Sequence, residues 1–172
     1  MDLYLIVLRI FHIVSGVFWA GGAFALVGFI SPAATKAGPA GGKFMQRLTL
    51  GTRWIMAVSA AAGVSVLTGA LLYWRASGGL RPEWITTGTG IAFTVGGLAA
   101  LIALFVGVQV GGNSRKLAEL GQRFEAAGGP PSPQDASQLA ALQARLQTLG
   151  TVTATLLVIT LLAMASARYL SF

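Results

Sequence analysis

His12 is the only histidine in the chain, and it lies inside an apolar run, FHIVSGVFWAGGAF, at residues 11–24. Neutral imidazole binds haem iron or copper, and it also donates and accepts hydrogen bonds. Residues three, four and seven positions away share its face of a helix, and they are Arg9, Gly16 and Trp19. We expect Gly16 to leave space beside the imidazole, Trp19 to wall that space, and Arg9 to reach the outer headgroups. These four residues form the candidate cofactor-binding site.

A second ligand for a metal is harder to find. The chain has no Cys, so disulfides and thiolate metal sites are excluded. Met164 is the methionine whose expected depth in the membrane is closest to that of His12, and a His and Met pair suits Cu(I) or haem iron. The metal-site hypothesis therefore rests on His12 and Met164. The alternative is a neutral His12 that is hydrogen-bonded to another helix, with Met164 serving only in packing.

Catalytic residues are not indicated. The five acidic residues lie outside the long apolar runs, and they are Asp2, Glu83, Glu119, Glu125 and Asp135. An intramembrane carboxylate of the kind that serves proton relays is therefore missing. His12 also has no acidic partner nearby in the sequence for a hydrolase triad. The sequence favours a role other than catalysis.

The composition is that of an integral membrane protein. Hydrophobic residues make up 55% of the 172 residues and charged residues only 10%, whereas soluble domains carry roughly 25% charged residues. Four runs approach or exceed the roughly 20 residues that cross a bilayer: about 3–30, 54–74, 85–110 and 148–170. Within lipid each must be a helix. We expect one all-α domain over residues 1–172, a four-helix transmembrane up-and-down bundle.

The basic residues indicate the orientation. Those near the first and third loops are Lys36, Lys43, Arg47, Arg53, Arg115, Lys116, Arg123 and Arg145, whereas those on the opposite side are Arg9, Arg75, Arg81 and Arg168. Because Lys and Arg favour the cytoplasmic side, both termini should lie outside the cell's inner membrane. The net charge of +7 indicates contact with anionic lipid and gives no support for nucleic-acid binding.

The third loop has helical patterning of its own. Leucine and phenylalanine recur at steps of three and four, at Leu117, Leu120, Phe124, Leu139, Leu142 and Leu146. The segment GGPPSP interrupts this pattern, and Ser132 before Pro133 predicts a helix N-cap. We therefore expect the third and fourth helices to continue past the membrane and to pair as a cytoplasmic helical hairpin.

The first loop is expected to break at Pro32 and again around Gly38 and Pro39, with the second helix beginning near Gly42. Small residues spaced four apart let helices in lipid approach closely, and we expect packing at Gly21 and Ala25, Ser59 and Gly63, Ser65 and Gly69, Ala92 and Gly96, and Gly107 and Gly111.

Several motifs resemble the copper-resistance protein D family and its four-helix relatives. They are HIVSGVFWAGGAF in the first helix, GPAGGKFMQRL in the first loop, TGALLYWR at the end of the second helix, the hairpin segments GGPPSP and LQARL, and MASARYL near the end. The resemblance covers nearly the whole chain. The resemblance implies a role in copper uptake or tolerance. A related group, the HemJ-type protoporphyrinogen oxidases, binds haem b through a histidine in the first helix. That role carries over only to His12.

Two functions follow as alternatives. In the first, the protein binds or moves copper, or holds haem b, through His12. In the second, it has no cofactor and is an accessory subunit of a larger respiratory or photosynthetic membrane complex. A homo-oligomer is compatible with either alternative.

Overall fold

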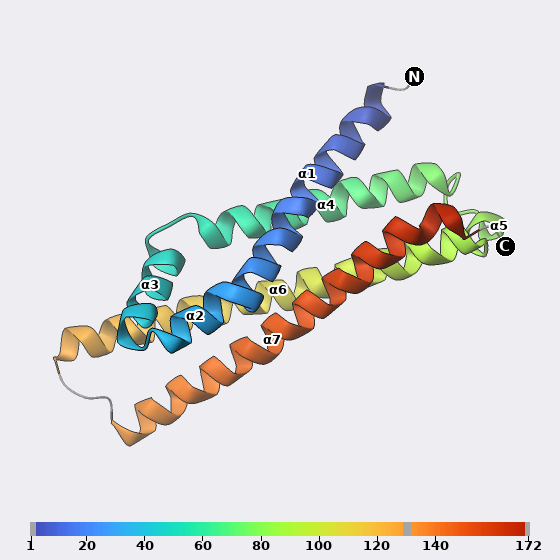
Figure 1. Cartoon of the computed structure of the whole chain (residues 1–172). Helices are drawn as coiled ribbons and strands as arrows, with labels where there is room; N and C mark the ends of the chain where they lie inside the picture. The colour runs from blue at the N-terminus through green and yellow to red at the C-terminus, as the bar shows by residue number, and fades with distance from the viewer. Residues whose placement is uncertain (1–2, 129–131, 171–172) are drawn as a thin grey trace.

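The computed structural model describes residues 3–128 and 132–170, and within these ranges the regular elements are all helices. Four helical stretches in this part of the chain are long and apolar enough to cross a membrane: Leu3–Lys36, Trp54–Ala76, Gly88–Ala127 and Pro133–Tyr169. Figure 1 shows them packed along one another. The predictions of an all-α fold and of four membrane-spanning helices are confirmed.

The first stretch is longer than predicted. It consists of α1 (Leu3–Ala25), the π-helix η1 (Leu26–Ile30) and α2 (Ser31–Lys36). The predicted break at Pro32 is wrong, because Pro32 lies in the first turn of α2, where its missing N–H is tolerated. The wider turn before it is closed by the N–H of Ser31, which donates to the carbonyl of Leu26. Such π-segments often mark functional regions of a helix.

The chain then turns at Gly38 (φ +59°) into α3 (Pro39–Leu50), which is followed by α4 (Trp54–Ala76). The prediction that the second helix begins near Gly42 is wrong, since residues 51–53 separate α3 from α4. The hydroxyl of Thr52 explains the separation. It donates to the Leu48 carbonyl at 2.6 Å and accepts from the Trp54 N–H at 3.1 Å, so it serves the end of one helix and the start of the next.

The third and fourth long helices extend well past their predicted spans, as expected. After the short α5 (Pro82–Ile85), α6 runs over Gly88–Ala127 and α7 over Pro133–Ser166, followed by the 3₁₀-helix η2 (Ala167–Tyr169). The predicted N-cap at Ser132 is confirmed, because its hydroxyl accepts from the Asp135 N–H at 3.2 Å.

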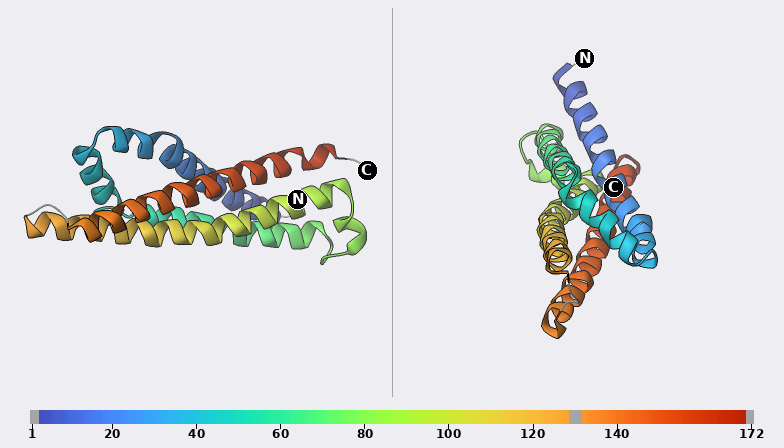
Figure 2. Two further views of the ribbon diagram at one scale, coloured as in Figure 1. Left: turned by 90° about the horizontal axis from the view of Figure 1, so that it is seen from below. Right: turned by 90° about the vertical axis from the view of Figure 1, so that its left-hand side faces the viewer.

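The core consists mainly of small residues. Helix α6 packs lengthwise against α7, and α1 crosses α4, as Figures 1 and 2 show from three directions. Where the helices meet, the buried residues are Trp19, Ala20, Ala62, Ala100, Ala103 and Leu157. Alanine at such contacts lets helix backbones come close, which replaces the hydrophobic driving force that is absent between helices in lipid.

The predicted small-residue contacts are present at only some positions. A Cβ on Gly96 would lie 3.0 Å from Met164 Cγ, and one on Gly111 would lie 3.2 Å from Ile55 Cγ2. In contrast, a Cβ on Gly21, Gly63 or Gly107 would meet nothing within 4 Å. The prediction that Gly107 packs within the bundle is therefore wrong.

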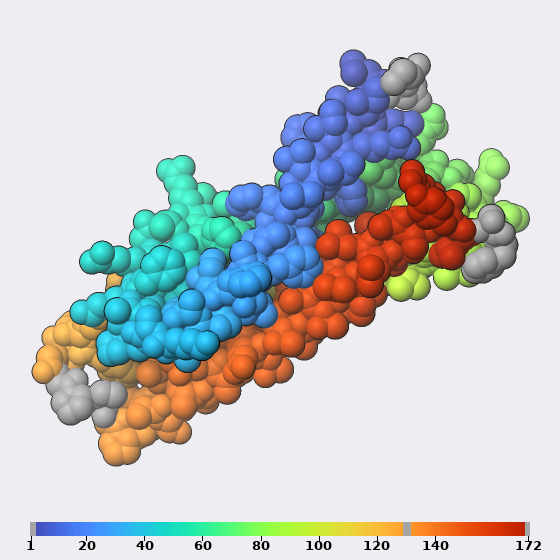
Figure 3. Space-filling view, viewed as in Figure 1, coloured from blue at the N-terminus to red at the C-terminus, as the bar shows by residue number. Residues whose placement is uncertain are grey.

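The outward faces of the bundle are apolar. Figure 3 shows the first turns of α1 projecting from the body of the molecule. Large apolar side chains along this helix are exposed, including Leu3 (73%), Ile13 (60%) and Val17 (67%). Such a surface is consistent with a lipid bilayer as the surroundings.

Candidate functional site: His12 between helices α1 and α4

His12 is hydrogen-bonded to the neighbouring helix. Its Nδ1 lies 2.8 Å from the backbone carbonyl oxygen of Ser65, which is on α4. Because a carbonyl only accepts, Nδ1 must carry the proton and donate it. In the neutral form of the ring, the lone pair is then on Nε2. The contact therefore determines the tautomer of the ring.

A second hydrogen bond runs in the opposite direction between the same two residues. The Ser65 hydroxyl, on a side chain that is 5% exposed, donates to the His12 carbonyl at 3.4 Å. The Thr68 hydroxyl, also on α4, donates mainly to the Val64 carbonyl at 2.6 Å and makes a longer contact of 3.1 Å with the Ser65 carbonyl. The two bonds between His12 and Ser65 tie α1 to α4 at the level of the histidine.

Two glycines make room for this contact, one on each helix. A Cβ on Gly69 would lie 2.9 Å from Cε1 and 3.1 Å from Nδ1 of His12, so the imidazole packs directly on the backbone of α4. A Cβ on Gly16 would lie 3.1 Å from the Ser65 hydroxyl oxygen. The open space predicted beside Gly16 is therefore filled by Ser65. Gly69 is the glycine that lies against the ring.

His12 is half-buried, and its second ring nitrogen has no hydrogen-bond partner among the described residues. Within the described ranges, every buried side-chain nitrogen or oxygen has a hydrogen-bond partner, and the ring bond found for His12 uses Nδ1. Nε2 is therefore not completely buried.

The other predicted site residues are more scattered. Trp19 is 5% exposed and belongs to the core cluster with Ala62 and Leu157, so the core accounts for its burial. Arg9 is exposed one turn before His12, as a residue reaching toward headgroups would be. Met164 lies on α7 against Gly96 of α6, whereas the hydrogen-bond partner and the adjacent glycine of His12 both lie on α4. These contacts do not bring Met164 and His12 together.

Metal ligands do not cluster in the described part of the chain. No group of three or more His, Cys, Asp or Glu side chains there is arranged to hold an ion.

The sequence did not identify Ser65 and Gly69 as members of this site. Their spacing of four residues was noted, but it predicted helix packing in general and did not point to His12. Ser65 and Gly69 can be assigned to His12 only once the crossing of α1 and α4 is known, because that crossing places them opposite the histidine.

No protein-family model, curated protein or solved structure matches the chain.

Proposed function

We propose that this protein binds haem b or copper through Nε2 of His12. The observation that supports the proposal is the 2.8 Å bond from His12 Nδ1 to the Ser65 carbonyl. Metal-binding histidines almost always donate their other ring N–H to a carbonyl or carboxylate, which orients the ring and makes the ligating nitrogen more basic. The bond to Ser65 would give Nε2 both properties.

The chain offers one imidazole ligand, His12, and therefore suits haem or copper only if a single ligand from this chain is enough. His12 would hold the iron of a haem or a copper ion, with any second ligand supplied from outside the chain. A copper ion held by several side chains of one chain fits poorly, since Met164 packs on α6. Bound haem or copper would supply one-electron chemistry. The chain would hold Nε2 in place through Ser65 and exclude water with its apolar helices.

The topology belongs to the same proposal. The bundle runs up and down through the inner membrane with both termini outside, and the far ends of α6 and α7 pair as a cytoplasmic helical hairpin. The bias of Lys and Arg supports this orientation. A reporter fused after Phe172 and one inserted between Gly128 and Pro133 should then report opposite sides. Reporters on the same side would exclude the arrangement.

A second function is favoured by one feature of the same contact. Because the Ser65 carbonyl already accepts from Nδ1, the ring's N–H is paired inside the membrane without a ligand. The protein would then be a cofactor-free accessory subunit of a larger membrane complex, and His12 would tie α1 to α4. The exposed apolar faces of the helices would contact the other subunits.

One experiment separates the two functions. The protein is purified in detergent after haem b or Cu(I) has been supplied, and its absorption spectrum and copper content are measured. Binding through His12 predicts a haem band or stoichiometric copper that His12→Ala removes, while Met164→Leu, the matched control, keeps haem. If the parent protein binds neither, the ligand proposal is wrong. His12→Ala should then only lower the stability, by about 0.6 kcal/mol for an interhelical hydrogen bond in a membrane.

A further inference from the structure

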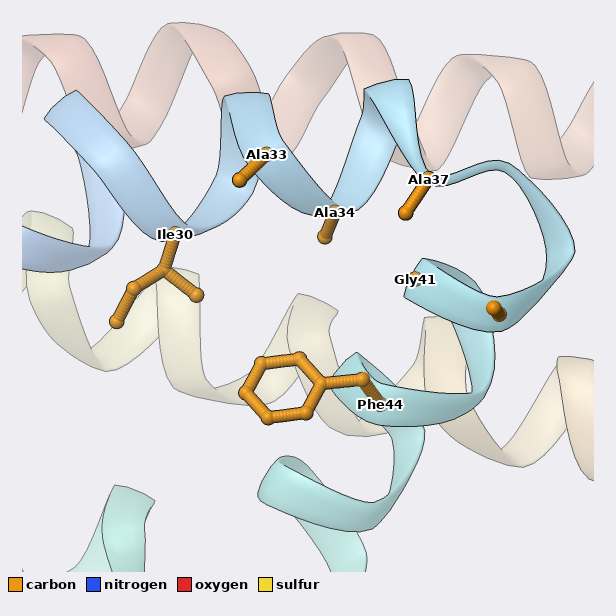
Figure 4. Close-up of a pocket in the computed structure, with 7 residues that line it drawn as sticks. Ile30, Ala33, Ala34, Ala37, Gly41 and Phe44 are labelled. Carbon is orange, nitrogen blue, oxygen red and sulfur yellow. The ribbon is translucent and has the colours of Figure 1, made fainter.

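An apolar groove of about 410 Å³ lies between α2 and α3, away from His12. Figure 4 shows Phe44 of α3 facing the alanines of α2, with Ile30 at one end. The remaining lining consists of Ala33, Ala34, Ala37, Ala40 and Gly41, so no polar side chain lines it. A groove of this composition suits a hydrocarbon ligand.

The walls of the groove are held by specific contacts. A Cβ on Gly41 would lie 1.9 Å from the Ala34 carbonyl oxygen, so the two helices touch at the closed end near the turn. Further along α3, Gln46 Nε2 donates to the Ala118 carbonyl of α6 at 3.3 Å. Lys43 also lies 4.0 Å from Glu125 of α6. These contacts with α6 keep α3 in place, and the groove is therefore formed before any ligand arrives.

The groove lies near the end of a membrane-spanning stretch. Leu3–Lys36 has 34 residues, which makes it about 50 Å long at 1.5 Å per residue. The hydrocarbon core of a bilayer is only about 30 Å thick. The last turns of this stretch, where α2 lies, are therefore at the boundary between acyl chains and headgroups if the stretch begins at the opposite surface.

The charged residues on α2 and α3 themselves are all basic, although Lys43 is paired with Glu125 of α6. Between Asp2 and Glu83 the sequence contains no carboxylate, while α2 and α3 carry Lys36, Lys43 and Arg47. Arg47 is exposed and lies one turn after Phe44, on the side of α3 that lines the groove. Lys36 is exposed at the end of α2. The surroundings are therefore complementary to an anionic headgroup.

We propose that the groove between α2 and α3 binds one acyl chain of an anionic phospholipid, whose phosphate lies against Arg47. The guanidinium of Arg47 suits a phosphate because it donates two parallel hydrogen bonds. The site is independent of the His12 proposal, since the residues that line the groove include neither His12 nor Ser65.

The test is lipid binding to the delipidated full-length protein in detergent, measured by native mass spectrometry. Dioleoyl phosphatidylglycerol is compared with dioleoyl phosphatidylcholine and with glycerol phosphate. Ala37→Leu fills the groove, and Ala140→Leu, at an exposed alanine of α7, is its control. Arg47→Gln removes a charge beside the groove, and Arg115→Gln, at an exposed arginine of α6, is its control. Thermal unfolding checks that each variant is folded.

We expect phosphatidylglycerol to bind more tightly than phosphatidylcholine, and glycerol phosphate not to bind. Arg47→Gln should weaken phosphatidylglycerol binding about fivefold, and Ala37→Leu should weaken both lipids, while the two control variants behave as the parent. Equal binding of the two lipids would exclude an anionic site, and equal binding of glycerol phosphate would exclude an acyl-chain site. Lipid binding that survives Ala37→Leu would overturn the proposal, as would a groove occupied by a second copy, seen as a dimer that Ala37→Leu dissociates.

If Ala37→Leu does not fold, a second measurement replaces it. Phe44→Trp places a fluorophore in the groove, and brominated phosphatidylglycerol should quench it more strongly than brominated phosphatidylcholine. Equal quenching would count against the proposal.

Discussion

Gly69→Ala tests whether His12 really packs on the backbone of α4. The new methyl group would lie 2.9 Å from Cε1 and 3.1 Å from Nδ1 of the imidazole, which is closer than van der Waals contact allows. The ring would have to rotate away, and its 2.8 Å bond to the Ser65 carbonyl would break. The substitution therefore perturbs the site without altering the histidine.

The expected magnitude combines three terms. Alanine in place of glycine inside a helix stabilises by about 0.5–1 kcal/mol. Overpacking costs about 1–3 kcal/mol, and the lost interhelical hydrogen bond costs about 0.6 kcal/mol. The unfavourable terms dominate, so Gly69→Ala should lower the free energy of unfolding by about 1–2 kcal/mol.

The assay is reversible unfolding in detergent, with Gly63→Ala as the matched control. Gly63 is on the same helix, and a Cβ there meets nothing within 4 Å, so this variant should be neutral or slightly more stable. Introducing Gly69→Ala into a His12→Ala background should cost much less, because the obstructing ring is gone. If Gly69→Ala is as stable as Gly63→Ala while His12 is present, the packing of the imidazole on α4 is refuted.

Three other predictions concern the bundle and its extensions. Gly96→Leu should lower the melting temperature in detergent because Met164 Cγ lies 3.0 Å from the position of a Cβ, whereas Gly107→Leu should not; equal effects would contradict the contact. Leu120 of α6 and Leu142 of α7 line one cleft, so cysteines at these two positions should be joined readily by a short bifunctional thiol reagent. Leu120→Cys with Ala144→Cys, an exposed position, is the control, and equal crosslinking yields would mean that α6 and α7 are not paired here. Ser132→Ala should destabilise the start of α7 by about 1 kcal/mol, seen as faster amide hydrogen exchange over residues 134–137, and unchanged exchange would remove the N-cap.

The spans and the α7 cap could be predicted from the sequence because each depends on local properties. Apolar length alone identified the four crossings, since lipid leaves helices as the only solution for such segments. Ser132 and Pro133 marked a helix start through the chemistry of a few consecutive residues. These signals do not depend on which helices are neighbours.

The two errors in helix boundaries have a common cause. Pro32 and Gly42 were interpreted through intrinsic preferences, which predicted an interruption at one and a helix start at the other. In the structure, the π-turn ahead of α2 accommodates the proline, and the Thr52 hydroxyl sets the boundary between α3 and α4. Both helix boundaries are set by specific hydrogen bonds, and the intrinsic helix preferences of proline and glycine give no information about these bonds.

The partner of His12 could not be predicted for a different reason. A backbone carbonyl has no identity in the sequence, so nothing in the residue types could point from His12 to the oxygen of Ser65 on another helix. What decides the pairing is the crossing of α1 and α4, and that crossing depends on Gly16 and Gly69 lying opposite Ser65 and the imidazole. The same bond satisfies the ring when nothing is bound and would orient Nε2 if iron or copper were present. The bond between His12 and Ser65 therefore bears on the stability of the helix crossing and on the proposed cofactor binding alike.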